Sequence, residues 1–131
     1  MKHTDIREAV MSALEAAGID EVLFDGRPAV FEEDDFPAIA VYLTNAVCTG
    51  EDLDADTWQA ILHIEVFLTA QASDSDLDKW MEGKIYPALS NIPGLEALIT
   101  TMTAQGYDYH RDEEMGVWSS ADMTYLITYE I

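Results

Sequence analysis

The sequence TWQAILHIEVFLT, residues 57–69, alternates between two kinds of side chain. Successive side chains of a strand point to opposite faces, so every second residue shares a face. One face would be entirely apolar, with Trp58, Ala60, Leu62, Ile64, Val66 and Leu68. The other would be mixed, with Gln59, Ile61, His63, Glu65 and Phe67. One entirely apolar face and one mixed face predict a sheet that helices cover on one side only.

A first helix is expected near the start of the chain. The apolar residues of 6–17 recur with the three- and four-residue spacing of an amphipathic helix. Thr4 or Asp5 would cap its start, since Asp5 and Glu8 have the spacing of a capping box. Gly18 would end the helix, because glycine readily adopts the left-handed conformation found after a last turn.

A second helix is expected after the strand at 57–69. Ser73 and Asp76 again have capping-box spacing, and residues 77–89 carry an apolar stripe. Pro87 lies inside that stripe and lacks a backbone donor. We therefore expect the helix to kink or end near Ile85.

Further strands are predicted at 22–24, 38–46 and, with clean alternation, from residue 118 to the end of the chain. A turn at 112–116 would join the last strand to a hairpin partner. The start of that partner stays open, because residues 95–102 suit either a short helix or a strand.

The elements therefore follow the order α-β-β-β-α-β-β. Hairpin connections dominate this order, which predicts a mixed, mostly antiparallel sheet with two main helices packed on one face. The fold class is an α+β sandwich of two layers. A chain of 131 residues without internal repeats or linkers is expected to form a single domain, residues 1–131.

The charge balance excludes two classes of partner. Asp and Glu total 26 against 6 Lys plus Arg, for a net charge of −20. Binding to nucleic acid or to an anionic membrane needs clustered cations, which this chain lacks. The acidity then serves either solubility alone or a surface that must not adhere to DNA. The single cysteine, Cys48, excludes an internal disulfide, and the sequence shows no signal peptide, so we expect folding in a reducing cytoplasm.

A metal site is the first hypothesis for so acidic a chain. Asp52, Asp54 and Asp56 imitate the first three ligands of a calcium loop. The sixth position is Thr57 rather than glycine, and the twelfth is His63 rather than glutamate. Asp74, Asp76 and Asp78 fail the same pattern. Residues 50–56 are therefore interpreted as a long solvated loop, and we expect no cofactor and at most weak binding of Mg²⁺ by these carboxylates.

No catalytic constellation is apparent. The sequence contains no GxSxG elbow, no glycine-rich phosphate loop and no HExxH spacing. His63 and Glu65, on one face of a predicted strand, would be the only start of a metal-assisted hydrolase. We expect the protein not to be an enzyme.

Several longer strings carry more specific information. They are Met1–Thr4, Phe24–Phe31, Asp35–Ala38, Thr57–Ala60, His63–Leu68, Gly106–Tyr109, Trp118–Asp122 and Thr124–Tyr125. Together, in this order and over the full length, they resemble the tail terminator family (minor tail protein U) of lambda-like long-tailed phages.

The resemblance implies a structural role. Proteins of this family form a hexameric ring on the head-proximal end of the tail tube, stop its polymerisation and offer the surface that the head joins. The implied partners are other copies of the chain, the major tail tube protein and the head–tail connector protein. DNA would pass through without specific binding, and no membrane is involved. The protein would assemble in the host cytoplasm and reside in the virion tail.

Candidate contacts of such a ring stay hypotheses at this stage. Arg27 would pair with a carboxylate of a neighbouring copy or make a local turn contact. Asp74 would contribute to an interface or cap the second helix. The loop with Asp52, Asp54 and Asp56 would order on ring formation or tube docking. The alternative function is an acidic DNA mimic that inhibits a DNA-binding enzyme.

Overall fold

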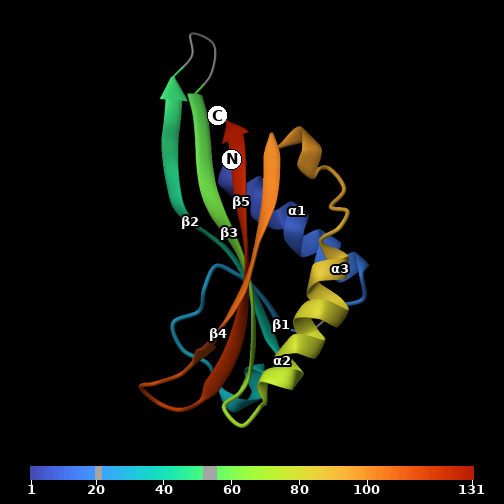
Figure 1. Ribbon diagram of the computed structural model, residues 1–131, viewed down its shortest axis with the longest axis vertical. Helices are drawn as coiled ribbons and strands as arrows, with labels where there is room; N and C mark the ends of the chain where they lie inside the picture. Colours follow the sequence, from blue (N-terminus) through green and yellow to red (C-terminus); the bar gives the residue numbers. More distant parts are fainter. Residues whose placement is uncertain (20–21, 52–55) are drawn as a thin grey trace.

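The computed structural model describes residues 1–19, 22–51 and 56–131. Its strands form one five-stranded sheet in the order β1-β2-β3-β5-β4. They are β1 (Val22–Asp25), β2 (Ala38–Glu51), β3 (Asp56–Thr69), β4 (Thr101–Arg111) and β5 (Trp118–Glu130). The β1–β2 pair is parallel and the other pairs are antiparallel. The predicted mixed, mostly antiparallel sheet is therefore confirmed (Figure 1).

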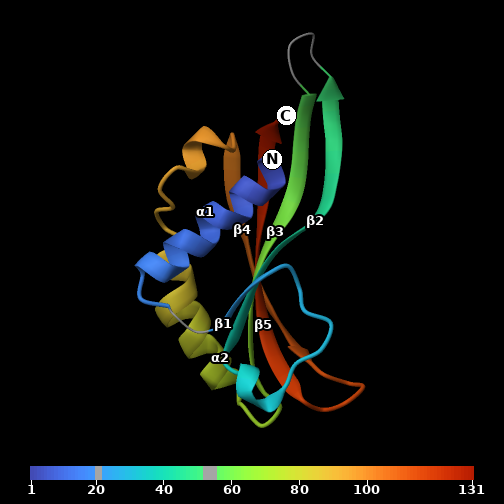
Figure 2. The same ribbon diagram turned by 180° about the vertical axis from the view of Figure 1, so that it is seen from behind.

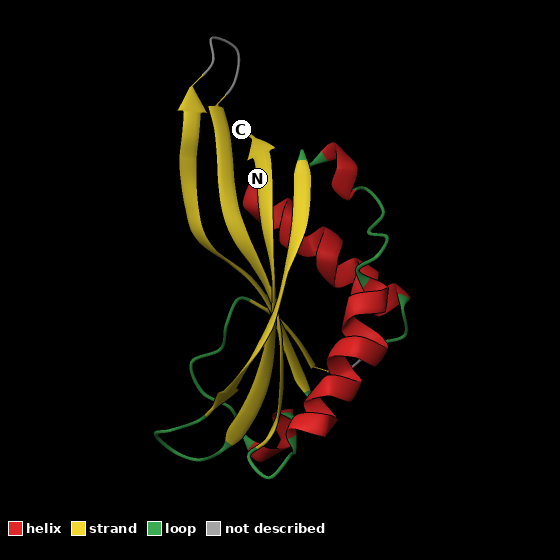
Figure 3. Ribbon diagram, viewed as in Figure 1, coloured by secondary structure: helices red, strands yellow, loops and turns green. Residues whose placement is uncertain are grey.

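The main helices lie on one face of this sheet, as expected (Figures 2 and 3). The first is α1 (Lys2–Ala16), and the second runs from α2 (Asp74–Trp80) through η2 (Met81–Ile85) to α3 (Tyr86–Ala88). Two short 3₁₀ turns, η1 (Glu33–Asp35) and η3 (Leu95–Ala97), complete the elements. None of the described helices combines the length and apolar character that crossing a membrane requires.

The core forms where the helices meet the apolar face of β3. Leu62, Ile64 and Val66 are fully buried there, against Val10 and Leu14 of α1 and other helix residues. Burying a side chain of this size contributes about 1.5–3 kcal/mol. A smaller cluster on the opposite sheet face contains Phe31, Ala38, Ala40 and Phe67.

The expected start of the first helix is wrong. The helix begins at Lys2 with Met1 as its N-cap, so Thr4 and Asp5 lie inside the first turn. The carbonyl of Met1 accepts from the amide of Asp5, which makes the first helical hydrogen bond at the very start of the chain. The expected end is confirmed, because Gly18 follows the last turn with a φ of +85°.

The long acidic loop expected at 50–56 is shorter than predicted. β2 continues to Glu51, β3 starts at Asp56, and these two residues pair across the hairpin. The predicted end of the strand at residue 46 is wrong because a register shift between Thr44 and Val47 inserts a bulge, after which pairing resumes. Residues 52–55 lie outside the described residues.

The second helix begins as predicted. The Ser73 hydroxyl accepts from the amide of Asp76, and the Asp76 carboxylate accepts from the amide of Ser73. Near Ile85 the helix widens into the π turn η2 and then continues past Pro87 to Ala88. A wider turn accommodates the proline, whose ring in a regular α-helix clashes with the carbonyl four residues earlier.

The segment 95–102 adopts both of the structures left open. Leu95–Ala97 form the 3₁₀ turn η3, and β4 starts at Thr101. The predicted turn at 112–116 joins β4 to β5, whose residues from Met123 to Tyr129 alternate between buried and more exposed positions.

Candidate functional site

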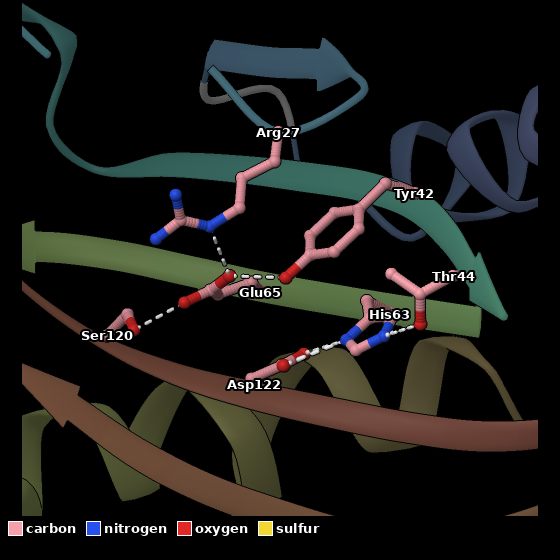
Figure 4. A network of polar contacts seen from close by, with 7 residues as sticks. All are labelled: Arg27, Tyr42, Thr44, His63, Glu65, Ser120 and Asp122. Atoms are coloured by element: carbon pink, nitrogen blue, oxygen red, sulfur yellow. Dashed lines mark hydrogen bonds and ion pairs between the residues drawn. The ribbon is translucent and has the colours of Figure 1, made fainter. Parts of the chain in front are cut away.

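A network of polar side chains lies on the sheet face away from the helices (Figure 4). We call it the polar network. It comprises Arg27, Tyr42, Thr44, His63, Glu65, Ser120 and Asp122. These residues come from β2, β3, β5 and the segment after β1. Four separate parts of the chain therefore meet here.

Glu65 is the buried centre of the network, with 1% of its surface exposed. Its carboxylate accepts from the hydroxyls of Tyr42 at 2.7 Å and Ser120 at 2.6 Å, and from Nε of Arg27 at 3.3 Å. A buried carboxylate is costly unless it is paired and hydrogen-bonded, and these three donors meet that need. Burial, together with the hydrogen bond to Glu65, raises the pKa of Tyr42.

Arg27 is held on two sides. Besides its ion pair with Glu65, its guanidinium lies 5.4 Å from the ring centres of both Phe67 and Trp118. The backbone before it turns at Gly26, whose φ is +102° and whose amide donates to the carbonyl of Val41. Arg27 thus makes a contact across the sheet within its own chain, while 42% of its side chain stays exposed.

His63 joins the second half of the network. Its Nδ1 lies 2.8 Å from Oδ2 of Asp122, and its Nε2 lies 2.7 Å from the hydroxyl of Thr44. The ring of Tyr42 stacks on the imidazole at 4.4 Å with 6° between the planes. If Nδ1 donates to the carboxylate, a neutral His63 accepts the Thr44 proton at Nε2.

The chain Thr44–His63–Asp122 has the connectivity of a nucleophile, a base and an orienting acid. Such a group needs a substrate cavity at the hydroxyl. A cavity of about 980 Å³ adjoins the network, and it is lined by Asp122 but by neither Thr44 nor His63. We therefore interpret the contacts of His63 with Thr44 and Asp122 as fixing the orientation of its ring within the sheet.

The walls of that cavity come from two projecting segments. One is the stretch 29–31 after β1, and the other is the β4–β5 turn. Each wall carries a large apolar side chain in solvent, Val30 at 78% and Met115 at 79% exposure. The cavity therefore lies between two segments that each expose one apolar side chain.

Asp74 lies at the other side of the sheet, away from the polar network. It occupies the first turn of α2, where Arg111 of β4 donates to its carboxylate at 2.5 Å and to the carbonyl of Ala72 at 2.8 Å. The interpretation of Asp74 as the helix cap is wrong, because Ser73 takes that position. Asp74 instead ties the helix to β4, and 62% of its side chain is exposed.

The acidic residues of the β2–β3 connection are only partly described. Asp56 is exposed at the first position of β3, whereas Asp52 and Asp54 lie outside the described residues. Within residues 1–19, 22–51 and 56–131, no group of three or more His, Cys, Asp or Glu is arranged to hold a metal ion.

Sequence reasoning identified His63 and Glu65 as neighbours on one strand face but not their partners. Glu65 faces Asp122 in the β3–β5 register, and Tyr42 faces His63 in the β2–β3 register. The available signal was the run of small and polar residues at 119–122, before the alternating part of the strand.

Comparison with known proteins gives a consistent result. A family model described as phage minor tail protein U matches residues 1–129. The chain is 67% identical to the tail tube terminator protein of Escherichia phage N15 and 65% identical to that of Escherichia phage lambda, with 100% of each chain covered. A chain of the solved virion of a native gene transfer agent particle has the same fold, with a TM-score of 0.59 at 15% identity over 95% of this chain and 94% of its own. The chain therefore belongs to the phage minor tail protein U family.

Proposed function

We propose that this chain is a tail tube terminator. Six copies form a ring on the head-proximal end of the tail tube, stop the addition of tube subunits and present the surface to which the head joins. The observation that carries the proposal is the identity of 65–67% over the full length to two tail tube terminator proteins. Membership of the minor tail protein family makes the chain a component of the virion tail.

The partners follow from this role. The ring contacts other copies of itself, the major tail tube protein and the head–tail connector protein, and it turns over no substrate. DNA passes through its opening, where carboxylates would repel phosphate and prevent binding. The polar network is consistent with a structural role, since through Arg27 it joins the segment after β1 to the sheet.

The charge of the ring makes its assembly sensitive to ions. Six chains of −20 carry six times that charge, −120, before counterions bind. Like charges brought close together repel unless salt screens them. We therefore propose that free copies assemble more readily in salt or Mg²⁺, with the ions acting on exposed carboxylates such as Asp56.

The first test measures the mass of the free protein and its ability to control tail length. Light scattering after size exclusion, with and without Mg²⁺, should give a hexamer or a monomer that converts to one. In a phage that lacks its own terminator, the chain should restore tails of uniform length, whereas its absence gives overlong tubes. A chain that neither self-assembles nor binds tail tubes would contradict the proposal.

Interface roles of Arg27 and Asp74 can be tested in the same assays. Arg27 would use the exposed part of its guanidinium on a carboxylate of a neighbour, and Asp74 would contribute its exposed carboxylate. Stable rings from Arg27→Ala would remove that residue from the interface. If the Asp74→Asn variant is folded and its rings are unchanged, Asp74 is also removed from the interface.

A further inference from the structure

The few cationic side chains of this chain differ in whether they contact a carboxylate or a carbonyl. Each arginine makes an ion pair, as Arg7 with Asp25, Arg27 with Glu65 and Arg111 with Asp74. Lys2 donates to the carbonyl of Leu98. In the described part of the chain, Lys79 and Lys84 have no ion-pair or hydrogen-bond partner. Both are exposed on the second helix, five residues apart.

These two lysines border an apolar groove of about 480 Å³. Its apolar lining includes Phe36, Pro37, Leu68 and Trp80. The ammonium of Lys84 lies 4.0 Å from the centre of the Trp80 ring, which holds it at the groove. The single carboxylate in the described lining, that of Asp76, is already bound to the amide of Ser73. The groove thus offers positive charge beside apolar surface in a strongly negative chain.

The β4–β5 turn has the complementary character. Glu113 and Glu114 are exposed there, and Met115 is 79% exposed. The turn is rigid, because the Asp112 carboxylate accepts from the amides of Glu114, Met115 and Val117 at 2.9–3.2 Å. A preordered loop loses little entropy on binding, and methionine adapts its shape to an apolar surface.

The two surfaces cannot meet within one molecule. In Figures 1 and 2 the second helix and the β4–β5 turn lie on opposite lateral sides of the lower end of the sheet. Complementary surfaces on opposite sides make a heterologous contact, the kind that closes into a ring when the rotation allows.

We propose that the Lys79–Lys84 groove receives the β4–β5 turn of a second copy of this chain. Met115 of that copy lies on the apolar floor near Trp80, and its Glu113 and Glu114 pair with the two lysines. The inference rests on the proposed ring and names the residues through which neighbouring copies hold one another.

Charge reversal tests this contact. Lys79→Glu with Lys84→Glu, or Glu113→Lys with Glu114→Lys, should raise the concentration needed for half-assembly by about tenfold or more, since like charges would meet. Combining all four substitutions in one chain should restore assembly. Glu8→Lys with Glu15→Lys is the matched control for the Glu113→Lys, Glu114→Lys pair, because it changes the net charge by the same amount and in the same direction at exposed positions of α1. Circular dichroism verifies that each variant is folded.

Covalent trapping provides a second measurement that also works on rings bound to tail tubes. In a Cys48→Ser background, which removes the exposed native thiol, Lys84→Cys with Glu114→Cys should give a ladder of linked copies with a short bismaleimide. Lys84→Cys with Glu8→Cys should give none.

The outcomes separate the contact from the proposed function. If the unchanged chain neither forms rings nor binds tubes, the ring itself is wrong. If it assembles and both reversals assemble equally well without a specific ladder, only the groove contact is wrong. Reversals that keep rings but lose tube binding would assign the groove to the tube protein and overturn the second copy as its occupant.

Discussion

Replacing Arg27 by alanine should destabilise the folded chain more than the loss of a surface ion pair does. The substitution leaves the Glu65 carboxylate, with 1% of the residue exposed, without its arginine partner. The hydroxyls of Tyr42 and Ser120 would still donate to it. Neither hydroxyl supplies the compensating positive charge.

The magnitude follows from the contacts that are lost. A hydrogen bond to a charged group contributes about 1.5–3 kcal/mol. The stacking of the guanidinium on Phe67 and Trp118 adds about 0.5–1 kcal/mol for each ring. Because 42% of the Arg27 side chain is exposed, water screens its charge and reaches the space it vacates, which reduces the sum. We expect a loss of about 2–3 kcal/mol in the free energy of unfolding.

Urea unfolding of the monomer measures this loss, with Arg7→Ala as the matched control. Arg7 pairs with Asp25 at 2.6 Å, but the aspartate side chain is 44% exposed, so its loss should cost less than about 1 kcal/mol. A double-mutant cycle with Glu65→Gln isolates the coupling between Arg27 and Glu65. Equal costs for Arg27→Ala and Arg7→Ala, or a coupling below about 0.5 kcal/mol, would refute the reasoning.

Four further substitutions have defined outcomes. Leu62→Ala, at a fully buried position, should lower the free energy of unfolding by about 2–5 kcal/mol, whereas Val30→Ala should change it by less than about 0.5 kcal/mol; urea midpoints that do not differ would contradict this. Hydrogen bonds from the amides of Val117, Met115 and Glu114 lower the pKa of Asp112 below 3.8, so its stabilisation is present above that pH and is lost as the pH falls through the lowered pKa. Asp112→Ala should therefore lower Tm at neutral pH, and the difference from the unchanged chain should shrink in acid; a constant difference would argue against the linkage. Burial raises the pKa of Tyr125 from 10.0 to about 12, so the unfolded chain loses this proton first and stability falls as the pH rises between these values. Tyr125→Phe should flatten that alkaline decline in Tm, and an unchanged slope would count against it.

Local features were predictable because they depend on neighbouring residues. The alternation at 57–69 predicted the buried face of β3, on which Leu62 and Ile64 are fully buried. The spacing of Ser73 and Asp76 predicted the cap of α2, which the structure confirms. In each case the relevant distance is set by the strand or helix geometry itself.

Errors arose where the wider structure overrides a local signal. Thr4 and Asp5 resemble a helix start, yet the helix begins at Lys2 and the carbonyl of Met1 accepts the first helical hydrogen bond. The acidic, unpatterned residues 50–56 resemble a loop, yet the bulge after Thr44 lets the β2–β3 pairing continue to Glu51. Pairing with a long neighbouring strand stabilises residues that have little strand propensity of their own.

The sequence by itself determined the α+β layering, the dry face of β3 and the strong negative charge, since period and composition need no knowledge of which segments meet. Only the tertiary structure decided that Arg27 pairs with Glu65 and that His63 lies between Thr44 and Asp122. These contacts join segments far apart in the chain. They depend on strand register, and a shift of one residue would send each side chain to the opposite face.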